Sequence, residues 1–224
     1  MVKFTWVKSK EVEIMDIYKV ILVILVFILS CFFTKERKRN KAIEKGIEGE
    51  REVKKILKKL PREYIVLNDL FINYKDRFAQ IDHVILSNKG IFVIETKNYS
   101  GKIYGDKYIK YWIQKLNGRK NKFYSPIWQN KTHINAIKFL LKDYRDVPIY
   151  SVIVFCGRCN IKKVKSDGNV IHVKRLKRYI KRFKSDIFIK NEQIMNISTI
   201  LNNNNMNSKK IRKKHIKMIK KEYI

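Results

Sequence analysis

Two acidic residues and one lysine are spaced in the sequence so that they could act together on a phosphodiester. Glu95 and Lys97 flank Thr96 in a strand-like apolar segment, so their side chains should project from the same face. Asp82 lies in the preceding apolar segment, and carboxylates on neighbouring strands can hold Mg²⁺. The Thr96 carbonyl could add a ligand, and Lys97 could orient or deprotonate the attacking water or offset charge in the transition state. Metal-dependent phosphodiester hydrolysis is the chemistry that this set fits.

Whether Asp82 joins Glu95 depends on the register of the hairpin expected between 81–86 and 91–97. Turn residues at 88–90 separate the two segments. A connection of two or four residues places Asp82 opposite Glu95, whereas an odd-length loop without a bulge turns it away. We predict the even register. On spacing alone, a cross-strand salt bridge is the ordinary interpretation of these charges.

A helix predicted over 46–60 contributes a third carboxylate. Its apolar stripe has helical spacing and consists of Val53, Ile56, Leu57 and Leu60. Extended backwards, the stripe reaches Gly46, Gly49 and Glu50. We therefore expect Glu50 on the buried face, and we expect both glycines to let that face approach another element closely. Alternatively, Glu50 could be a carboxylate favoured by the helix dipole at the start of a helix.

Further strands and helices surround these segments. Ser125 and Pro126 fit the N-cap and first position of a helix whose apolar residues continue to Leu141. A near-continuous apolar run at 149–155 is typical of a central strand covered on both faces. The other predicted elements are strands at 64–67 and 170–173, an extended pair within 101–116 followed by an Asn-Gly turn, helical pieces from 176 onward, a loop at 202–205 and a basic stretch at 209–221. That last stretch could be a helix that contacts phosphates or a solvated terminus.

Three other groups of residues have a simple structural interpretation. His83 should face away from Asp82 and is expected to pack rather than to bind a ligand. Cys156 and Cys159 have the spacing of a redox or zinc motif, but no second pair exists, and a coincidence at a strand end is favoured. Aromatic residues alternate with lysines in 104–115 and could stack bases beside phosphate contacts, although such aromatics more often pack a sheet face. They are Tyr104, Tyr108, Tyr111 and Trp112, with Lys107, Lys110 and Lys115.

An apolar segment near the N-terminus predicts a membrane span. The run at 17–33 is interrupted only by Lys19, and counted from Ile14 it approaches the roughly 20 residues that cross a bilayer core. A basic stretch at 35–45 follows instead of a cleavage site. The positive-inside rule then predicts a single-pass membrane protein with its N-terminus outside and its domain in the cytoplasm. A buried soluble helix is the alternative.

The charge balance indicates a polyanionic partner. The 224 residues include 51 Lys and Arg against 20 Asp and Glu, which gives a formal net charge of +31. This balance argues against a domain that handles small neutral ligands. Nucleic acid and anionic lipid both attract clustered positive charge, and charge alone does not choose between them. The three cysteines lack a regular framework, which indicates a reducing compartment.

Four motifs occur in a characteristic order within 41–163. They are Gly46-x-x-Gly49-Glu50, Gln80-Ile81-Asp82-His83-Val84, the run from Gly90 to Gly105 that contains Glu95-Thr96-Lys97, and Pro126-x-x-Gln129-Asn130-x-x-His133. Together they resemble the nuclease-related domain (NERD) family, a branch of the PD-(D/E)xK restriction-endonuclease-like superfamily. The resemblance covers more than half of the chain.

This resemblance implies an α/β/α domain around a mixed sheet. The active-site Asp of the superfamily falls on Asp82, its acid-x-Lys motif on Glu95 and Lys97, and its helix-borne Glu on Glu50. A further family motif on the following helix makes three residues auxiliary candidates, namely Gln129, Asn130 and His133. Gln129 and His133 are four residues apart and should face the same way.

We therefore predict an α/β protein with a restriction-endonuclease-like core preceded by one transmembrane helix. The predicted parts are a short segment at 1–13, the transmembrane helix at 14–34, a basic linker at 35–45, the nuclease-like domain at 46–165 and a basic extension at 166–224. The expected function is membrane-anchored hydrolysis of DNA or RNA with Mg²⁺ or Mn²⁺, held by Asp82, Glu95 and the Thr96 carbonyl, with Glu50 as an optional ligand. The alternatives are a nucleic-acid-binding module without catalysis and a scaffold at an anionic lipid surface.

Overall fold

The structure, a computed structural model, describes residues 3–75 and 77–208, without the side chains of 3–17, 20 and 77. The chain divides into two compact units, 1–45 and 46–224. The predicted basic stretch at 209–221 lies outside the described residues.

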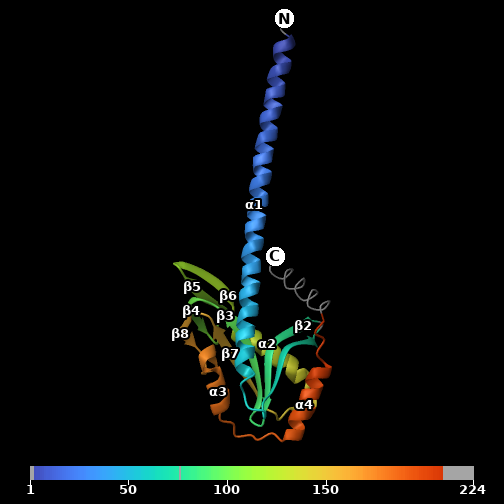
Figure 1. The fold of residues 1–224 in the computed structure, drawn as a ribbon, viewed down its shortest axis with the longest axis vertical. Helices are drawn as coiled ribbons and strands as arrows, with labels where there is room; N and C mark the ends of the chain where they lie inside the picture. The colour runs from blue at the N-terminus through green and yellow to red at the C-terminus, as the bar shows by residue number, and fades with distance from the viewer. Residues whose placement is uncertain (1–2, 76, 209–224) are drawn as a thin grey trace. The chain divides into compact units, whose positions relative to one another are not determined.

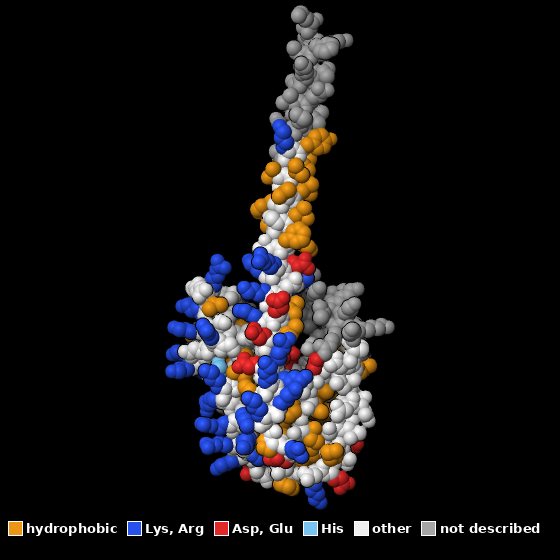
Figure 2. All heavy atoms as spheres, viewed as in Figure 1, with side chains coloured by type: hydrophobic (Ala, Val, Ile, Leu, Met, Phe, Trp, Pro, Cys, Tyr) orange, Lys and Arg blue, Asp and Glu red, His pale blue; other side chains and the backbone are white. Residues whose placement is uncertain are grey.

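The first unit is helical. Helix α1 (Lys3–Leu57) runs through it, and the last turns of α1 belong to the second unit. Large apolar side chains of α1 are exposed from Tyr18 to Phe33, as the orange side chains in Figure 2 show. The predicted span 14–34 lies partly on side chains that are not described. Within the described residues no helix is both long enough and apolar enough to cross a membrane, and the predicted span is not confirmed.

The second unit contains a mixed sheet of five strands (Figure 1). Strands β1 (Ile65–Tyr74), β2 (Arg77–Ser87) and β3 (Gly90–Asn98) form an antiparallel meander. Strands β7 (Ile149–Cys156) and β9 (Val170–His172) continue the sheet parallel to β3, in the order β1-β2-β3-β7-β9. The strand that carries Glu95 and Lys97 is therefore the central one.

Helices cover both faces of this sheet. Adjacent residues of β3 point to opposite faces, so each face contributes to a separate core. On one side, Val93 lies in a core with α2 (Pro126–Leu140) and α4 (Asn191–Asn203). On the other side, Phe92 lies in a core with the end of α1 and with α3 (Leu176–Arg182). Short 3₁₀ helices lie at Lys142–Tyr144 and Val173–Arg175. The expected α/β core with a mixed sheet is confirmed.

A second sheet of four strands was only partly predicted. It contains β4 (Gly101–Asp106), β5 (Tyr111–Leu116), β6 (Arg119–Tyr124) and β8 (Cys159–Lys165), in the order β6-β5-β4-β8. We call it sheet B. The predicted Asn-Gly turn at 117–118 joins β5 to β6, and both of its residues have the positive φ that a tight hairpin requires. Strands β6 and β8 gave no signal because their residues are mostly polar and exposed.

Residues 205–207, which follow α4, cover part of the free edge of β1. Phe71 donates its backbone N–H to the Asn205 side chain at 2.9 Å and accepts a backbone bond from Met206 at 2.9 Å. Asn207 donates to the carbonyl of Asp69 at 2.9 Å. The loop was predicted at 202–205, whereas α4 (Asn191–Asn203) includes the first two of these residues, so the prediction is only partly correct. The residues that follow the helix satisfy backbone groups that an uncovered edge strand would expose.

Candidate active site

Asp82 and Glu95 lie opposite each other on β2 and β3. A two-residue turn joins Ser87 to Gly90, and the paired residues continue as far as His83 with Ile94. The next position of this register sets Asp82 across from Glu95. Asp82 Oδ2 also accepts a hydrogen bond from the backbone N–H of Thr96 at 2.7 Å. The predicted even register is confirmed.

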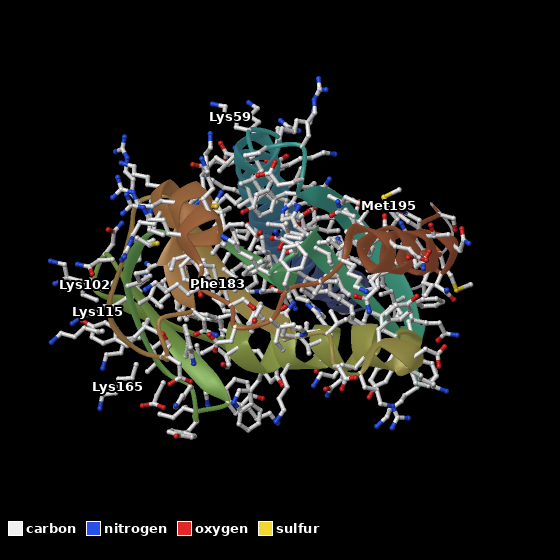
Figure 3. All side chains as sticks on the ribbon, turned by 90° about the horizontal axis from the view of Figure 1, so that it is seen from below. Lys59, Lys102, Lys115, Lys165, Phe183 and Met195 are labelled. Atoms are coloured by element: carbon white, nitrogen blue, oxygen red, sulfur yellow. The ribbon has the colours of Figure 1, made fainter. Side chains whose placement is uncertain are left out.

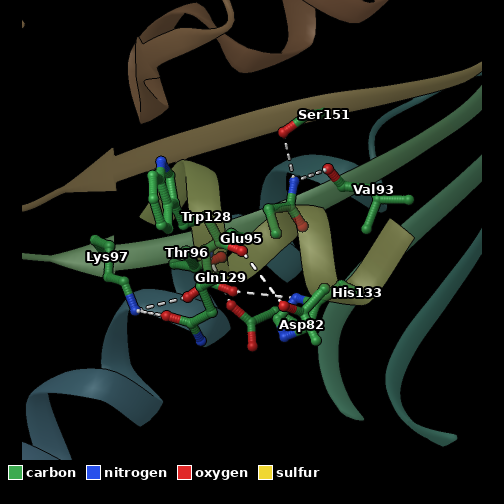
Figure 4. A network of polar contacts seen from close by, with 11 residues as sticks. Asp82, Val93, Glu95, Thr96, Lys97, Trp128, Gln129, His133 and Ser151 are labelled. Carbon is green, nitrogen blue, oxygen red and sulfur yellow. Dashed lines mark hydrogen bonds and ion pairs between the residues drawn. The ribbon is translucent and has the colours of Figure 1, made fainter. Parts of the chain in front are cut away.

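The Lys97 ammonium lies between Glu95 and the first turns of α2 (Figure 4). Its Nζ is 2.6 Å from Glu95 Oε1 and donates to Gln129 Oε1 at 2.9 Å. The other carboxylate oxygen of Glu95 is 3.4 Å from His133 Nδ1. Gln129 and His133 therefore face the same charged pair, as their spacing predicted.

Asn130 fastens α2 to the sheet and does not contact the charged pair. Its fully buried side chain donates to the Val93 carbonyl at 2.8 Å and to Ser151 Oγ at 2.9 Å. The predicted start of α2 is confirmed, because Ser125 caps the helix and Pro126 is its first residue. This anchoring of α2 positions Gln129 and His133 over β3.

Ser151 and Trp128 were missed by sequence reasoning. Ser151 is the one serine or threonine in a strand of otherwise apolar and aromatic residues, which is a usable signal for a buried hydrogen bond. Trp128 lies beside Gln129 and is partly exposed, and its Nε1 donates to the Lys107 carbonyl at 3.1 Å. It therefore connects the candidate site to the turn between β4 and β5.

Gly49 brings the end of α1 close to β3. A Cβ at Gly49 would lie 2.7 Å from Asn98 Cβ, closer than carbon atoms can approach. A Cβ at Gly46 would meet nothing within 4 Å, so the expectation that both glycines permit close packing is wrong for Gly46. The reason is that only Gly49 faces the sheet. Glu50, the next residue, is half-buried, and its negative charge acts on Asp82.

The carboxylates make Asp82 an unusual acid. Burial raises the pKa of Asp82 well above its usual range, and the charges of Glu95 and Glu50 raise it further. The Thr96 N–H and the Lys97 ammonium act in the opposite direction but do not offset these effects. The ionised form of Asp82 would therefore be favoured by an additional cation.

Lys97 is a cation at neutral pH. Burial alone would lower the pKa of Lys97, but the adjacent Glu95 carboxylate outweighs this effect and the pKa is raised. A lysine that holds its proton can donate hydrogen bonds and stabilise negative charge. In the metal-free protein this charge state favours stabilisation of negative charge over proton abstraction as the role of Lys97.

The chemistry of the donor set fits a hard divalent cation. Asp82 and Glu95 supply carboxylate oxygens, and Glu95 Oε2 is buried without a hydrogen bond in the described structure. The Thr96 N–H faces β2, and the carbonyl of a residue in an extended strand points to the same side as its N–H. Among the described residues no group of three or more His, Cys, Asp or Glu could hold a metal ion. Two carboxylates with a carbonyl and water are a set that Mg²⁺ accepts.

The remaining singled-out residues have structural roles. His83 is buried, its Nδ1 lies 2.8 Å from Asn68 Oδ1, and burial with the charge of Lys54 lowers its pKa to about 4. Cys156 ends β7 and Cys159 begins β8, and neither forms a disulfide. Burial raises the pKa of both thiols, that of Cys159 to about 11. This argues against a reactive thiolate at neutral pH.

Known proteins resemble this chain in sequence. A family model described as nuclease-related domain matches residues 45–156. An uncharacterized protein of Bacillus anthracis is 34% identical over 185 residues, which is 80% of this chain and 85% of that protein. No solved structure matches significantly. The family match includes the strands that carry Asp82, Glu95 and Lys97, together with all of α2.

Proposed function

Because this chain belongs to the nuclease-related domain family, we propose that its second unit hydrolyses phosphodiester bonds of nucleic acid with a divalent metal ion. The family is part of the restriction-endonuclease-like superfamily and generally uses divalent metals. One observation carries the proposal. The 2.7 Å bond from the Thr96 N–H to Asp82 brings the acid of β2 to the residue between Glu95 and Lys97.

Each residue of the site has a distinct role in this proposal. Asp82, Glu95 and the Thr96 carbonyl would hold Mg²⁺ or Mn²⁺, and Glu50 adds negative charge beside Asp82. The bound ion would polarise the phosphate and lower the pKa of a bound water. The Lys97 ammonium would stabilise charge on the phosphate oxygens. Gln129 orients Lys97 from the other side.

Nucleic-acid binding without catalysis is the second candidate. Loss of one member of the catalytic set would be the expected mark of such a module. Asp82, Glu95 and Lys97, the three members of this set, are all present, and Lys97 Nζ lies 2.6 Å from Glu95 Oε1. This arrangement favours hydrolysis over binding alone.

The test uses the full chain with labelled single-stranded and duplex DNA and RNA, in Mg²⁺, in Mn²⁺ and in EDTA. Asp82→Ala and Lys97→Ala are run beside the unmodified protein. We expect metal-dependent cleavage that both substitutions abolish. Cleavage that persists in both variants would contradict the site assignment. No cleavage of any substrate by the unmodified protein would contradict hydrolysis and leave the binding module.

The membrane anchor is a separate proposal with a separate test. Its support is the run of exposed apolar side chains between Ile21 and Phe33, followed by the basic stretch 35–45. In intact cells, an external protease is expected to spare the second unit, since the proposal puts that unit in the cytoplasm. Recovery of the whole protein in the soluble fraction, without detergent, would contradict the anchor.

A further inference from the structure

Sheet B has an apolar inner face and a basic outer face. Trp112 and Ile103 point inward and pack with Phe155 of β7, and Gly105 leaves room for the Trp112 ring. Alternate residues of the same strands point outward. Six exposed lysines of the four strands make up what we call the basic face. They are Lys102, Lys115, Lys120, Lys122, Lys163 and Lys165.

Three of these lysines stand directly opposite one another on neighbouring strands. Lys102 of β4 pairs with Lys115 of β5, which pairs with Lys120 of β6. Strands lie about 4.8 Å apart, and like charges placed directly opposite destabilise a sheet. Within the described part of the chain, none of the three forms an ion pair with a carboxylate. A polyanion bound across the row would remove this repulsion.

Tyr111 places an aromatic ring among these positive charges. The ring is 42% exposed, and the ammonium groups of Lys122 and Lys110 lie 4.6 and 5.6 Å from its centroid. Tyr108, in the adjoining turn, is 77% exposed. A ring flanked by ammonium groups can stack a base while its neighbours contact phosphates. A lipid headgroup surface offers no base to stack.

The basic face is connected to the candidate active site through α2. The turn that follows β4 accepts a hydrogen bond from Trp128 through the carbonyl of Lys107. The next residue of α2, Gln129, accepts the hydrogen bond of Lys97. Neighbouring residues of α2 thus contact both the edge of sheet B and the Lys97 ammonium of the candidate site.

We infer that the basic face of sheet B binds the phosphate backbone of single-stranded nucleic acid, with a base stacked on Tyr111. Figure 3 shows Lys102, Lys115 and Lys165 pointing outward on one side of the molecule, and Figure 2 shows Lys and Arg gathered along the side of β4, β5 and β8. That this binding serves to deliver a substrate rests on the proposed function. The binding itself requires neither metal nor cleavage.

The first experiment measures binding of labelled oligothymidylate to the full chain in EDTA by fluorescence anisotropy. Each phosphate contact makes the logarithm of the association constant fall with the logarithm of the salt concentration. Three contacts to a single strand account for a slope of about −2. The triple variant K102Q/K115Q/K120Q should therefore bind about 100-fold more weakly at about 0.1 M salt, with the salt slope shallower by about 2. The matched control K55Q/K58Q/K59Q loses the same charge near the end of α1 and should change affinity only slightly. Equal losses in both variants would overturn the proposal.

The second experiment tests the aromatic contact and the class of partner. Tyr111→Leu should weaken binding of oligothymidylate about 10-fold and leave an abasic strand of equal length unaffected. Equal effects on both strands would overturn the stacking.

The triple variant should unfold at a temperature equal to or above that of the unmodified protein, because repulsion between the lysines is removed. This measurement excludes misfolding as the cause of lost binding. The opposing outcome is stronger binding to vesicles that contain phosphatidylserine than to oligothymidylate. If the triple variant also loses that vesicle binding, the face is assigned to lipid and the proposal is overturned.

These outcomes are separable from those of the proposed function. A protein that binds through the basic face but never cleaves contradicts hydrolysis alone. A protein that cleaves normally, and whose triple variant binds normally, contradicts the inference alone.

Discussion

The backbone N–H of Thr96 donates a 2.7 Å hydrogen bond to the Asp82 carboxylate. This bond forms where the regular pairing of β2 with β3 ends, at His83 and Ile94. The Asp82 carboxylate thus accepts the Thr96 N–H in place of a backbone carbonyl of β2. Asp82 is therefore held beside Glu95 before any ligand binds. Such preorganisation lowers the cost of assembling a metal site.

Asp82→Asn should abolish cleavage without disturbing the fold. The amide oxygen of Asn can still accept the Thr96 N–H, whereas the negative charge needed for the metal is lost. We expect the cleavage rate to fall by at least about 100-fold, the scale of losing one charge-stabilising group. Gel assays of labelled DNA and RNA measure this. Asp143→Asn, at an exposed carboxylate in the 3₁₀ helix after α2, is the control and should leave the rate unchanged.

The same substitution should stabilise the metal-free protein at neutral pH. Because the folded pKa of Asp82 is raised, its ionisation opposes folding, and this penalty grows as the pH rises from the ordinary pKa towards the raised folded pKa. Below the ordinary value of 3.8 the penalty is absent. Urea unfolding in EDTA should therefore show Asp82→Asn more stable than the unmodified protein at neutral pH, with the difference vanishing near pH 4. A pH-independent difference would indicate another cause.

Glu50→Gln should shift the pH dependence of cleavage. Metal binding requires ionised Asp82, so the rate should rise with pH through the raised pKa of Asp82. Removing the charge of Glu50 lowers that pKa and should move the acid limb of the rate profile to lower pH. Rates across the pH range at one fixed Mn²⁺ concentration below saturation measure the shift, because saturating metal would displace the proton from Asp82. An unmoved acid limb, with the rate changed equally at all pH values, would mean that Glu50 does not act on Asp82.

Lys97→Met should destabilise the protein, and a second substitution should reverse the effect. Removing the ammonium leaves the Glu95 carboxylate buried without its 2.6 Å partner, which typically costs about 3–5 kcal/mol. The double variant Glu95→Gln/Lys97→Met should recover most of this free energy of unfolding while remaining inactive. Denaturant titrations of the four proteins form the cycle. Additive effects would show that the pair is not coupled.

Gly49→Ala and Gly46→Ala should differ in sign. The new methyl at Gly49 would lie 2.7 Å from Asn98 Cβ and should lower the free energy of unfolding by about 1–3 kcal/mol. At Gly46 nothing lies within 4 Å, and alanine is the better helix former by about 0.5–1 kcal/mol. Chemical denaturation of both variants checks the prediction. A loss at Gly46 equal to that at Gly49 would contradict the packing described for α1.

The candidate site could largely be predicted because its determinants are local. A strand has a period of two, so Glu95 and Lys97 had to share a face whatever surrounds them. A two-residue turn likewise fixes the register that sets Asp82 opposite Glu95. Strands β6 and β8 could not be predicted in this way, because polar, exposed edge strands lack an apolar alternation.

The sequence by itself determined the family, the central strands, the helix start at Ser125 and the set of residues that could meet. Only the tertiary structure decided that Gly49 rather than Gly46 contacts β3, and that Asn130 anchors α2 while Gln129 reaches Lys97. It also decided the charge states of the site. Packing distances and pKa values depend on which groups from distant parts of the chain are buried together, and no local periodicity specifies that.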